Sequence, residues 1–160
     1  MQNIVVRQAT AEDLATLNRF QQGIVDVERR FDATIKDGPV QYYDISRMLA
    51  SEEIHFVVAE ADGVLIGCGY ARIEAAKHYL RHAQHAYLGL MYVDPAYRGQ
   101  SVNSTIIDAL KRWSLSKGIL EARLEAYREN VAAIKAYEKA GFSQFVIEMR
   151  LALGDGGGKS

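Results

Sequence analysis

The stretch Asn130-Val-Ala-Ala133-Ile-Lys-Ala-Tyr137-Glu-Lys-Ala-Gly141-Phe142 decides the fold of this 160-residue chain. It predicts one short helix that begins at a capping Asn130, carries Tyr137 on its apolar face and ends at Gly141. A second stretch lies upstream, Val93-Asp-Pro-Ala-Tyr-Arg98-Gly99-Gln100-Ser101-Val102-Asn103, and predicts a strand end, a glycine turn and a helix start. Together they favour a phosphate-bearing cofactor at a helix N-terminus, with a phenol nearby.

Hydrophobic periodicity predicts the elements around these two stretches. Strands are expected at residues 4–7, 54–59, 64–74, 85–93, 120–127 and 145–153. Helices are expected at residues 14–31, 44–51, 104–117 and 130–140. The order predicts a mostly antiparallel sheet with helices on both faces and a β-α-β crossover in its second half. Gly67 and Gly69 interrupt one strand, which indicates a bulge, tight packing or the close approach of another backbone.

Composition limits the classes of protein to which the chain can belong. Hydrophobic residues make up 49% and charged residues 24%, which is typical of a globular domain. We expect a single domain over residues 1–153 and a flexible tail over residues 154–160. A net charge of -1 gives no electrostatic reason to expect nucleic acid or an anionic membrane as partner.

The single cysteine and the N-terminal sequence add two expectations about environment. Cys68 alone excludes a disulfide framework or a cysteine-based metal site within one chain, and its apolar surroundings predict a buried, inert thiol. The start of the chain lacks the apolar core of a signal peptide, and no apolar run is long enough to span a bilayer. Cytoplasmic residence is therefore the default expectation.

The glycine turn at residues 98–101 suits an anion. Backbone N–H groups at a helix start converge on one spot, and the helix dipole favours negative charge there. Arg98 adds a permanent cation, while Ser101 and Ser104 add hydroxyl groups. The alternative is an ordinary glycine turn with an exposed arginine. The chain contains neither G-x-x-x-x-G-K-[ST] nor a G-x-G-x-x-G after its first strand, so neither a P-loop nor a Rossmann site is supported.

The order of elements and motifs resembles the GNAT superfamily of acyl-CoA-dependent N-acyltransferases over about residues 3–152. The motifs that carry the resemblance are Met91-Tyr-Val93-Asp-Pro95, Arg98-Gly99-Gln100 with the following helix, and Asn130-x-x-Ala133-x-x-x-Tyr137-x-x-x-Gly141-Phe142. The resemblance implies an α/β (α+β) fold with a mixed, mostly antiparallel sheet of about six to seven strands. Its fourth and fifth strands would be splayed apart.

The same resemblance implies acetyl-CoA as cosubstrate and no metal. The residues expected to bind the coenzyme are Met91, Tyr92, Val93, Arg98, Gly99, Gln100, Ser101, Val102, Asn103, Ser104, Asn130 and Tyr137. Ser101 and Asn103 depart from the family, which has glycine or another small residue there. A helical φ at Ser101 would cost little, whereas a positive φ would cost about 1 kcal/mol or more. We expect coenzyme binding to be retained.

The implied reaction is direct attack of a primary amine on the acetyl thioester within a ternary complex. Tyr137 would protonate the departing thiolate, since a phenol with a reference pKa of about 10 is protonated at neutral pH. A backbone N–H near Val93 would stabilise the oxyanion. Packing of an ordinary aromatic residue on the helix is the alternative for Tyr137.

The general base is left open by the sequence, because the residues before the Met91 motif include no acid. Glu74, Glu125, His85 and a water chain are the candidates. Asn130 can act as a helix cap, touch the coenzyme, or both. Lys135 and Lys139 lie on the same helix and are expected to be surface residues, with a coenzyme phosphate as the alternative partner.

The resemblance also suggests where the acceptor binds, at about residues 25–43 and 75–85. Acids and aromatic residues in the first stretch suit a cationic amine, while the basic second stretch suits a carboxylate. The acceptor is therefore expected to be a small-molecule or peptide amine, of unspecified identity. A catalytically silent acyl-CoA-binding sensor or partner module is the alternative function. A homodimer is compatible with the sequence, which fixes no interface.

Overall fold

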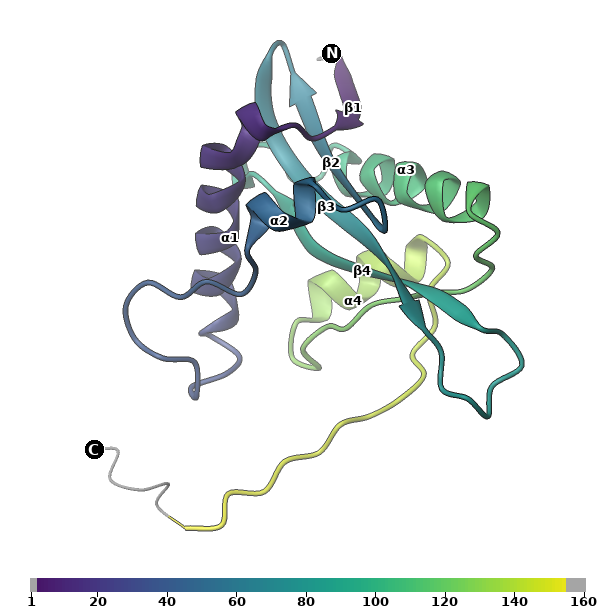
Figure 1. Cartoon of the computed structure of the whole chain (residues 1–160). Coiled ribbons are helices and arrows are strands. Elements are labelled where there is room, and N and C mark those ends of the chain that lie inside the picture. The colour runs from purple at the N-terminus through teal and green to yellow at the C-terminus, as the bar shows by residue number, and fades with distance from the viewer. Residues whose placement is uncertain (1–2, 155–160) are drawn as a thin grey trace.

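The computed structural model describes residues 3–154, which form one sheet with helices packed against it (Figure 1). The strands are β1 (Ile4–Gln8), β2 (Ile54–Ala61), β3 (Val64–Ala75), β4 (Gln84–Val93) and β5 (Ala122–Arg123). They lie in the order β1-β2-β3-β4-β5. The first four pair antiparallel, and β5 pairs parallel to β4. Of the predicted flexible tail, residues 155–160 lie outside the described part of the chain.

The helices are α1 (Leu14–Glu28), α2 (Ile45–Leu49), α3 (Val102–Ser116) and α4 (Val131–Lys139), with short 3-10 turns η1 (Ala11–Asp13) and η2 (Pro95–Tyr97). Alternate side chains of β2 point to opposite faces of the sheet. Phe56 and Val58 pack with α1 and α2, whereas Val57 and Ala59 pack with α3. None of the helices between residues 3 and 154 is long and apolar enough to cross a membrane.

Local chemistry explains most element boundaries. The backbone N–H of Thr10 donates to the Asp13 carboxylate over 2.8 Å, completing a capping box before α1. Asp44 accepts a hydrogen bond from the backbone of Arg47 at the start of α2. The β2–β3 turn places Asp62 and Gly63 at φ 51° and 81°, as a two-residue hairpin requires.

Gly67 and Gly69 permit β4 and α3 to approach β3 closely. A Cβ on Gly67 would lie 2.7 Å from the carbonyl oxygen of Tyr92, and one on Gly69 would lie 2.9 Å from Ile106 of α3. The β3–β4 register shifts between Cys68 and Tyr70, which marks a bulge beside these glycines. The bulge and the close backbone approach expected from the glycines are therefore both confirmed.

The sheet has five strands in the described residues, not the expected six to seven. The predicted strand at residues 120–127 shortens to Ala122–Arg123, because β5 pairs with β4 at two positions only. The predicted strand at residues 145–153 is not part of the sheet. Its apolar sequence is strand-like, but a strand also needs a neighbour whose backbone groups it can pair with.

Candidate cofactor and acceptor site

The fourth and fifth strands separate beyond their first contact. Ala86 pairs with Ala122 and Tyr87 with Arg123, and no later residue of β4 pairs with β5 in the described structure. The edge of β4 from Leu88 to Val93 is therefore open to an extended ligand that pairs as a strand would. The splayed arrangement expected from the resemblance is confirmed.

A bulge interrupts β4 within this open edge. Leu90 has φ 49°, a left-handed conformation that is strained for a branched side chain. The Leu90 side chain is buried beside Cys68, and the Cys68 thiol donates to the Leu90 carbonyl over 3.3 Å. Strain of this kind persists where surrounding structure enforces it and is common at ligand sites.

The three predicted cofactor residues of β4 act as core residues through their side chains. Met91 and Val93 pack on the α3 side of the sheet, and Tyr92 packs on the α1 side. The Tyr92 ring stacks on Phe20 with centroids 4.5 Å apart. Their backbone groups can therefore pair with a ligand while their half-buried side chains pack against the core.

The predicted phosphate turn leads directly into the N-terminus of α3. Gly99 and Ser101 have φ 80° and 66°, and the Ser101 side chain makes no capping hydrogen bond. The first backbone N–H groups of α3 have no partner within the helix and are not capped by Ser101. This arrangement fits the coenzyme pyrophosphate, since uncapped donors and a positive helix end favour an anion.

The side chains around this turn differ in how far they are exposed to a ligand. Arg98, Gly99, Gln100, Ser101 and Ser104 are exposed, Asn103 is half-buried and Val102 is buried. The Ser104 hydroxyl donates to the Ser101 carbonyl over 3.0 Å, as does that of Thr105 over 2.9 Å. The expected role of Ser104 as a hydroxyl donor thus competes with this internal bond, and Val102 can offer only its backbone.

Tyr137 lies half-buried on α4 with its ring edge-to-face against Phe142, at a centroid distance of 6.1 Å. Burial, followed by the negative charge of Glu28, raises the pKa of Tyr137 to about 12. The phenol is therefore fully protonated at neutral pH and can donate a proton.

The other predicted residues of α4 have ordinary structural roles. The Asn130 side chain accepts from the backbone N–H of Ala133 over 3.2 Å and so caps the helix. Lys135 and Lys139 are exposed. Capping alone accounts for Asn130, and contact with a coenzyme stays a prediction.

The three candidate general bases are engaged with residues other than Tyr137. Glu74 accepts from Arg72 at 2.6 Å and lies 3.3 Å from Nε2 of His85. Glu125 accepts from the hydroxyl of Tyr87 over 3.2 Å. Glu74 and His85 thus form one polar group across β3 and β4. Glu125 lies instead just after β5, where β4 and β5 separate.

An acidic and aromatic group, which we call the acceptor cluster, lies where α1 ends. It consists of Glu28, Phe31, Asp32, Tyr42 and Tyr127. Phe31 stacks on Tyr127 with centroids 5.8 Å apart, and the Tyr127 hydroxyl donates to Asp32 over 3.4 Å. Burial raises the pKa of Glu28, although its interaction with the Tyr42 hydroxyl lowers it in part. Burial likewise raises the pKa of Tyr42.

Sequence reasoning missed two relationships in the acceptor cluster. Tyr127 was expected only as the end of a strand, yet it joins Asp32 from almost a hundred residues away. Glu28 was one of several acids in its stretch, and only the fold brings its charge close enough to act on Tyr137. No local signal could have revealed either one, because both depend on contacts between distant segments.

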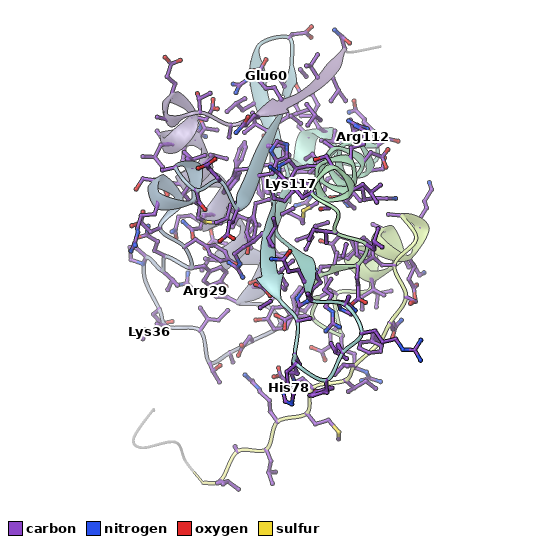
Figure 2. All side chains as sticks on the ribbon, turned by 45° about the vertical axis from the view of Figure 1, so that its right-hand side comes forward. Arg29, Lys36, Glu60, His78, Arg112 and Lys117 are labelled. Carbon is purple, nitrogen blue, oxygen red and sulfur yellow. The ribbon has the colours of Figure 1, made fainter. Side chains whose placement is uncertain are left out.

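The two loops predicted to bind the acceptor differ in how many contacts hold them. Arg29 donates to the carbonyl of Lys36 over 2.6 Å and also to that of Gly38, which fixes the α1–α2 loop (Figure 2). His78 lies at the far end of the β3–β4 loop, where it is exposed (Figure 2). His82 lies 3.6 Å from Glu121 and is partly buried. Glu121 thus places an acid beside the second predicted acceptor stretch.

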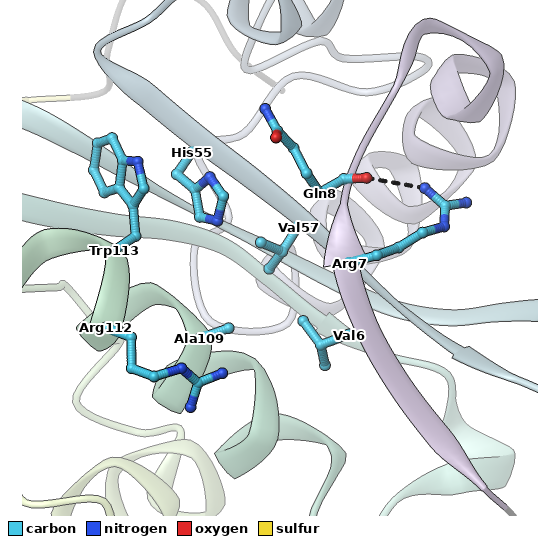
Figure 3. A pocket seen from close by; sticks show the side chains of 8 residues that line it. All are labelled: Val6, Arg7, Gln8, His55, Val57, Ala109, Arg112 and Trp113. Atoms are coloured by element: carbon cyan, nitrogen blue, oxygen red, sulfur yellow. Dashed lines mark hydrogen bonds between the residues drawn. The ribbon is translucent and has the colours of Figure 1, made fainter. Parts of the chain in front are cut away.

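An open pocket of about 350 Å3 lies between the first two strands and α3, on the face of the sheet that α3 covers. Its lining comes from β1, β2 and α3, with His55 stacked on Trp113 at a centroid distance of 5.3 Å (Figure 3). None of the predicted site residues lines it. The volume of a pocket therefore does not locate the predicted cofactor site. An extended ligand that pairs with a strand edge needs no deep pocket.

Comparison with known proteins gives a family match over most of the chain. The model of the acetyltransferase (GNAT) family matches residues 21–142. This range includes the open edge of β4, the turn before α3 and the whole of α4.

Curated relatives match parts of the chain. A streptothricin acetyltransferase of Escherichia coli is 39% identical over 32% of this chain and 29% of its own length. An IAA acetyltransferase of Azospirillum brasilense is 26% identical over 59% of this chain and 58% of its own. An acetyltransferase of Sodalis glossinidius is 30% identical over 60% of this chain and 62% of its own length. The chain thus spans less than two thirds of each of these relatives.

Solved structures show the same fold at low identity. A protein of Bacillus halodurans has a TM-score of 0.82 at 18% identity, over 93% of this chain and 99% of that one. The aminoglycoside N-acetyltransferase AAC(6')-Iy in complex with CoA has a TM-score of 0.73 at 23% identity, over 94% and 96%. A Clostridium acetobutylicum acetyltransferase solved with acetyl-CoA has a TM-score of 0.69 at 19% identity, over 94% and 97%.

Proposed function

Because this chain belongs to the GNAT family of acetyltransferases, we propose that it is an N-acetyltransferase that moves an acetyl group from acetyl-CoA to a primary amine. One observation carries the proposal. The open, bulged edge of β4 and the uncapped N-terminus of α3 are joined by the short connection over residues 94–101, which contains η2. A strand edge suits the amide-bearing arm of the coenzyme, and a helix N-terminus suits its pyrophosphate.

The residues proposed to hold the coenzyme are those of β4 and the turn. Backbone groups of Met91 and Val93 would pair with the arm, and the turn from Arg98 to Ser104 would receive the pyrophosphate. The exposed Arg98 adds positive charge beside the first N–H groups of α3. When bound, acetyl-CoA supplies a thioester whose C–S bond breaks as the amine nitrogen forms a C–N bond.

The chain's own groups perform the proton and charge steps. A backbone N–H near Val93 would donate to the carbonyl oxygen as negative charge develops there. Tyr137 would transfer its hydroxyl proton to the departing thiolate and take up a proton from the amine nitrogen as the amide forms. Its raised pKa keeps the hydroxyl proton in place beforehand. Proximity of the amine to the thioester would come from the acceptor cluster.

We assign to Glu28 the binding of the cationic amine and the uptake of its proton. Its carboxylate is partly buried beside the Tyr42 hydroxyl and lies close enough to influence Tyr137. A buried carboxylate favours a cation, and a raised pKa makes it a better proton acceptor near neutral pH. The names of the relatives include streptothricin and aminoglycoside acetyltransferases, which supports a small-molecule amine with several positive charges.

Release of free thiol from acetyl-CoA tests the proposal. The purified chain would be assayed with streptothricin and aminoglycosides, with amino acids and with short peptides, and acetyl-CoA binding would be measured in parallel by calorimetry. We expect thiol release with cationic small molecules and its loss in Tyr137→Phe. Binding of acetyl-CoA without turnover on every amine class would instead support a catalytically silent sensor. The strained Ser101 and the absence of an acid on β4 favour that alternative.

A further inference from the structure

The sheet is hollowed on its α3 side because β1 is shorter than β2. Gln8, the last residue of β1, pairs with Val57, so Ile54 and His55 of β2 have no β1 residue opposite them. The open pocket of about 350 Å3 occupies this place, between the end of β1, the start of β2 and α3 (Figure 3). Its volume falls within the range of about 300–1,000 Å3 that is typical of small-molecule sites.

The lining of this pocket combines small apolar side chains with a flat aromatic wall. Val6, Val57 and Ala109 contribute the apolar part. His55 and Trp113 form the wall, where their rings stack with planes 7° apart and centroids 5.3 Å apart (Figure 3). Both aromatic side chains are half-buried, so part of the stack faces the pocket. A planar ring can pack against a surface of this kind.

The charge beside the aromatic wall is positive. Burial, followed by the positive charge of Lys117, lowers the pKa of His55, so the imidazole is neutral at pH 7. The Lys117 ammonium lies 5.8 Å from the Trp113 ring centroid, and the exposed Arg112 lines the pocket. Within residues 3–154, neither Arg112 nor Lys117 forms an ion pair with an acid.

Arg7, the other cation of the lining, is already matched by acids. Its guanidinium lies 2.9 Å from the Asp13 carboxylate and 2.8 Å from that of Glu60. Among the described residues, the positive charge that stays without an acid at this pocket is therefore that of Arg112 and Lys117. A guanidinium with free donors binds a carboxylate through two parallel hydrogen bonds.

We propose that this pocket binds a small planar aromatic carboxylate. The aromatic ring packs between the small apolar side chains and the His55–Trp113 stack. The carboxylate pairs with the Arg112 guanidinium, and Lys117 adds a second positive charge nearby. The pocket shares no residue with the proposed coenzyme and acceptor sites, so this ligand is neither acetyl-CoA nor the amine.

The single tryptophan of the chain makes binding at this pocket directly observable. Trp113 emission, excited where tyrosine absorbs little, would be followed as benzoate is added to the full chain. We expect a saturable change with a Kd of about 1 mM or below. Benzamide lacks the charge and cyclohexanecarboxylate lacks the flat ring, so each should bind about tenfold more weakly or worse. The absence of a saturable change, or an equal affinity for either analogue or for inorganic phosphate, would overturn the proposal.

Substitutions on α3 test the place of the ligand. Arg112→Gln should weaken benzoate binding by about tenfold or more, because it removes the charged partner of the carboxylate. Lys111→Gln is the matched control and should leave binding unchanged, since Lys111 lies 4.0 Å from Asp108 and donates to the Ala140 carbonyl over 3.4 Å. Ala109→Leu should abolish binding, because the larger side chain fills the pocket.

Saturation-transfer NMR of benzoate gives these affinities without relying on the emission of Trp113, which the substitutions can alter directly. Circular dichroism and Tm show whether each variant is folded, and only folded variants are compared. Benzoate affinity that persists in Arg112→Gln or in Ala109→Leu would place the ligand elsewhere and sink the assignment. None of these measurements depends on turnover, so they stand whether or not the proposed function does.

Discussion

The thiol of Cys68 on β3 donates a hydrogen bond over 3.3 Å to the carbonyl of Leu90, the residue that bends β4 into its bulge. Cys68 has 0% exposure, and burial raises the pKa of its thiol. The only cysteine of the chain therefore supports the backbone shape of β4. Its packing role agrees with the inert thiol expected from the sequence.

Cys68 should not react with a thiol reagent in the native protein. Ellman's reagent needs an accessible thiolate, and both access and ionisation are suppressed here. We expect labelling at least about 100-fold slower than in an Ala15→Cys variant, because it requires local opening of the sheet. One thiol per chain should react after unfolding in urea. Rapid reaction of the native parent would contradict the burial of Cys68.

Ser101→Gly should stabilise the protein. Ser101 has φ 66°, and a left-handed conformation costs an L-residue about 1–2 kcal/mol that glycine avoids. After allowing for the greater freedom of glycine in the unfolded chain, we expect a gain of about 1 kcal/mol and a rise in Tm of about 2–4 °C. Ser104→Gly, the same change inside the helix, should destabilise. Scanning calorimetry measures both variants. Equal changes in Tm for the two variants would show that strain at Ser101 does not affect stability.

Tyr137→Phe should lower turnover by about 100-fold or more while leaving acetyl-CoA affinity nearly unchanged, as expected for loss of a general acid. The pKa of Tyr137 is raised to about 12, so its protonated form persists across the working range. The pH profile of the parent should accordingly show no fall in kcat due to this phenol between about pH 7 and 10. Steady-state thiol release and calorimetry separate the two effects. Equal losses of kcat and affinity would indicate a packing role instead.

Glu28→Gln should lower kcat/KM for cationic amines by about tenfold or more, since loss of the charge removes one strong interaction. Burial raises the pKa of Glu28, so the parent should lose activity as the pH falls through that raised value. The variant should lack this acidic limb. Asp26→Asn changes an exposed acid on the same helix and serves as the control. An unchanged acidic limb in Glu28→Gln would assign it to another group.

Asp13→Asn should lower stability in a pH-dependent way. The Arg7 guanidinium, at 2.9 Å from the Asp13 carboxylate, lowers the pKa of that carboxyl. A lowered folded-state pKa contributes stability above the unfolded pKa, and this contribution disappears as the pH falls through the folded value. We expect a loss of about 1–2 kcal/mol at pH 7, limited by the partial exposure of Arg7, and a smaller difference below about pH 4.

Urea unfolding at several pH values between 3 and 7 measures this difference. Glu12→Gln, an exposed neighbour, should have little effect. A difference between parent and Asp13→Asn that stays constant over the range would show that packing, and not the ion pair, is responsible.

Much of the fold could be predicted because its signals are local. The capping residues Thr10, Asp44 and Asn130 each bond to a group three residues away, and the Asp62-Gly63 turn closes a hairpin between adjacent strands. Such contacts are decided by the residue types themselves. The splay of β4 and β5 was predicted from the family resemblance, and the structure confirms it.

Other features could not be predicted, because they depend on residues distant in sequence. The positive φ of Ser101 reflects how the turn after β4 meets α3, and neither outcome was favoured by the sequence. The strand predicted at residues 145–153 is wrong, because these residues join no sheet in the described structure. A strand forms only where a second edge is present, and alternation says nothing about where that edge lies.

The sequence by itself determined the helices, four of the five strands and the turn before α3. It also determined that Tyr137 lies on the apolar face of α4. Both follow because periodicity and capping act over a few residues. The tertiary structure alone brought Glu28 near Tyr137, joined Tyr127 to Asp32 and bent β4 at Leu90. Among the described residues, it also left one edge of β5 unpaired and residues 145–153 outside the sheet. These relationships arise from packing between segments far apart in the chain, where the burial of apolar surface and not local preference sets which groups meet.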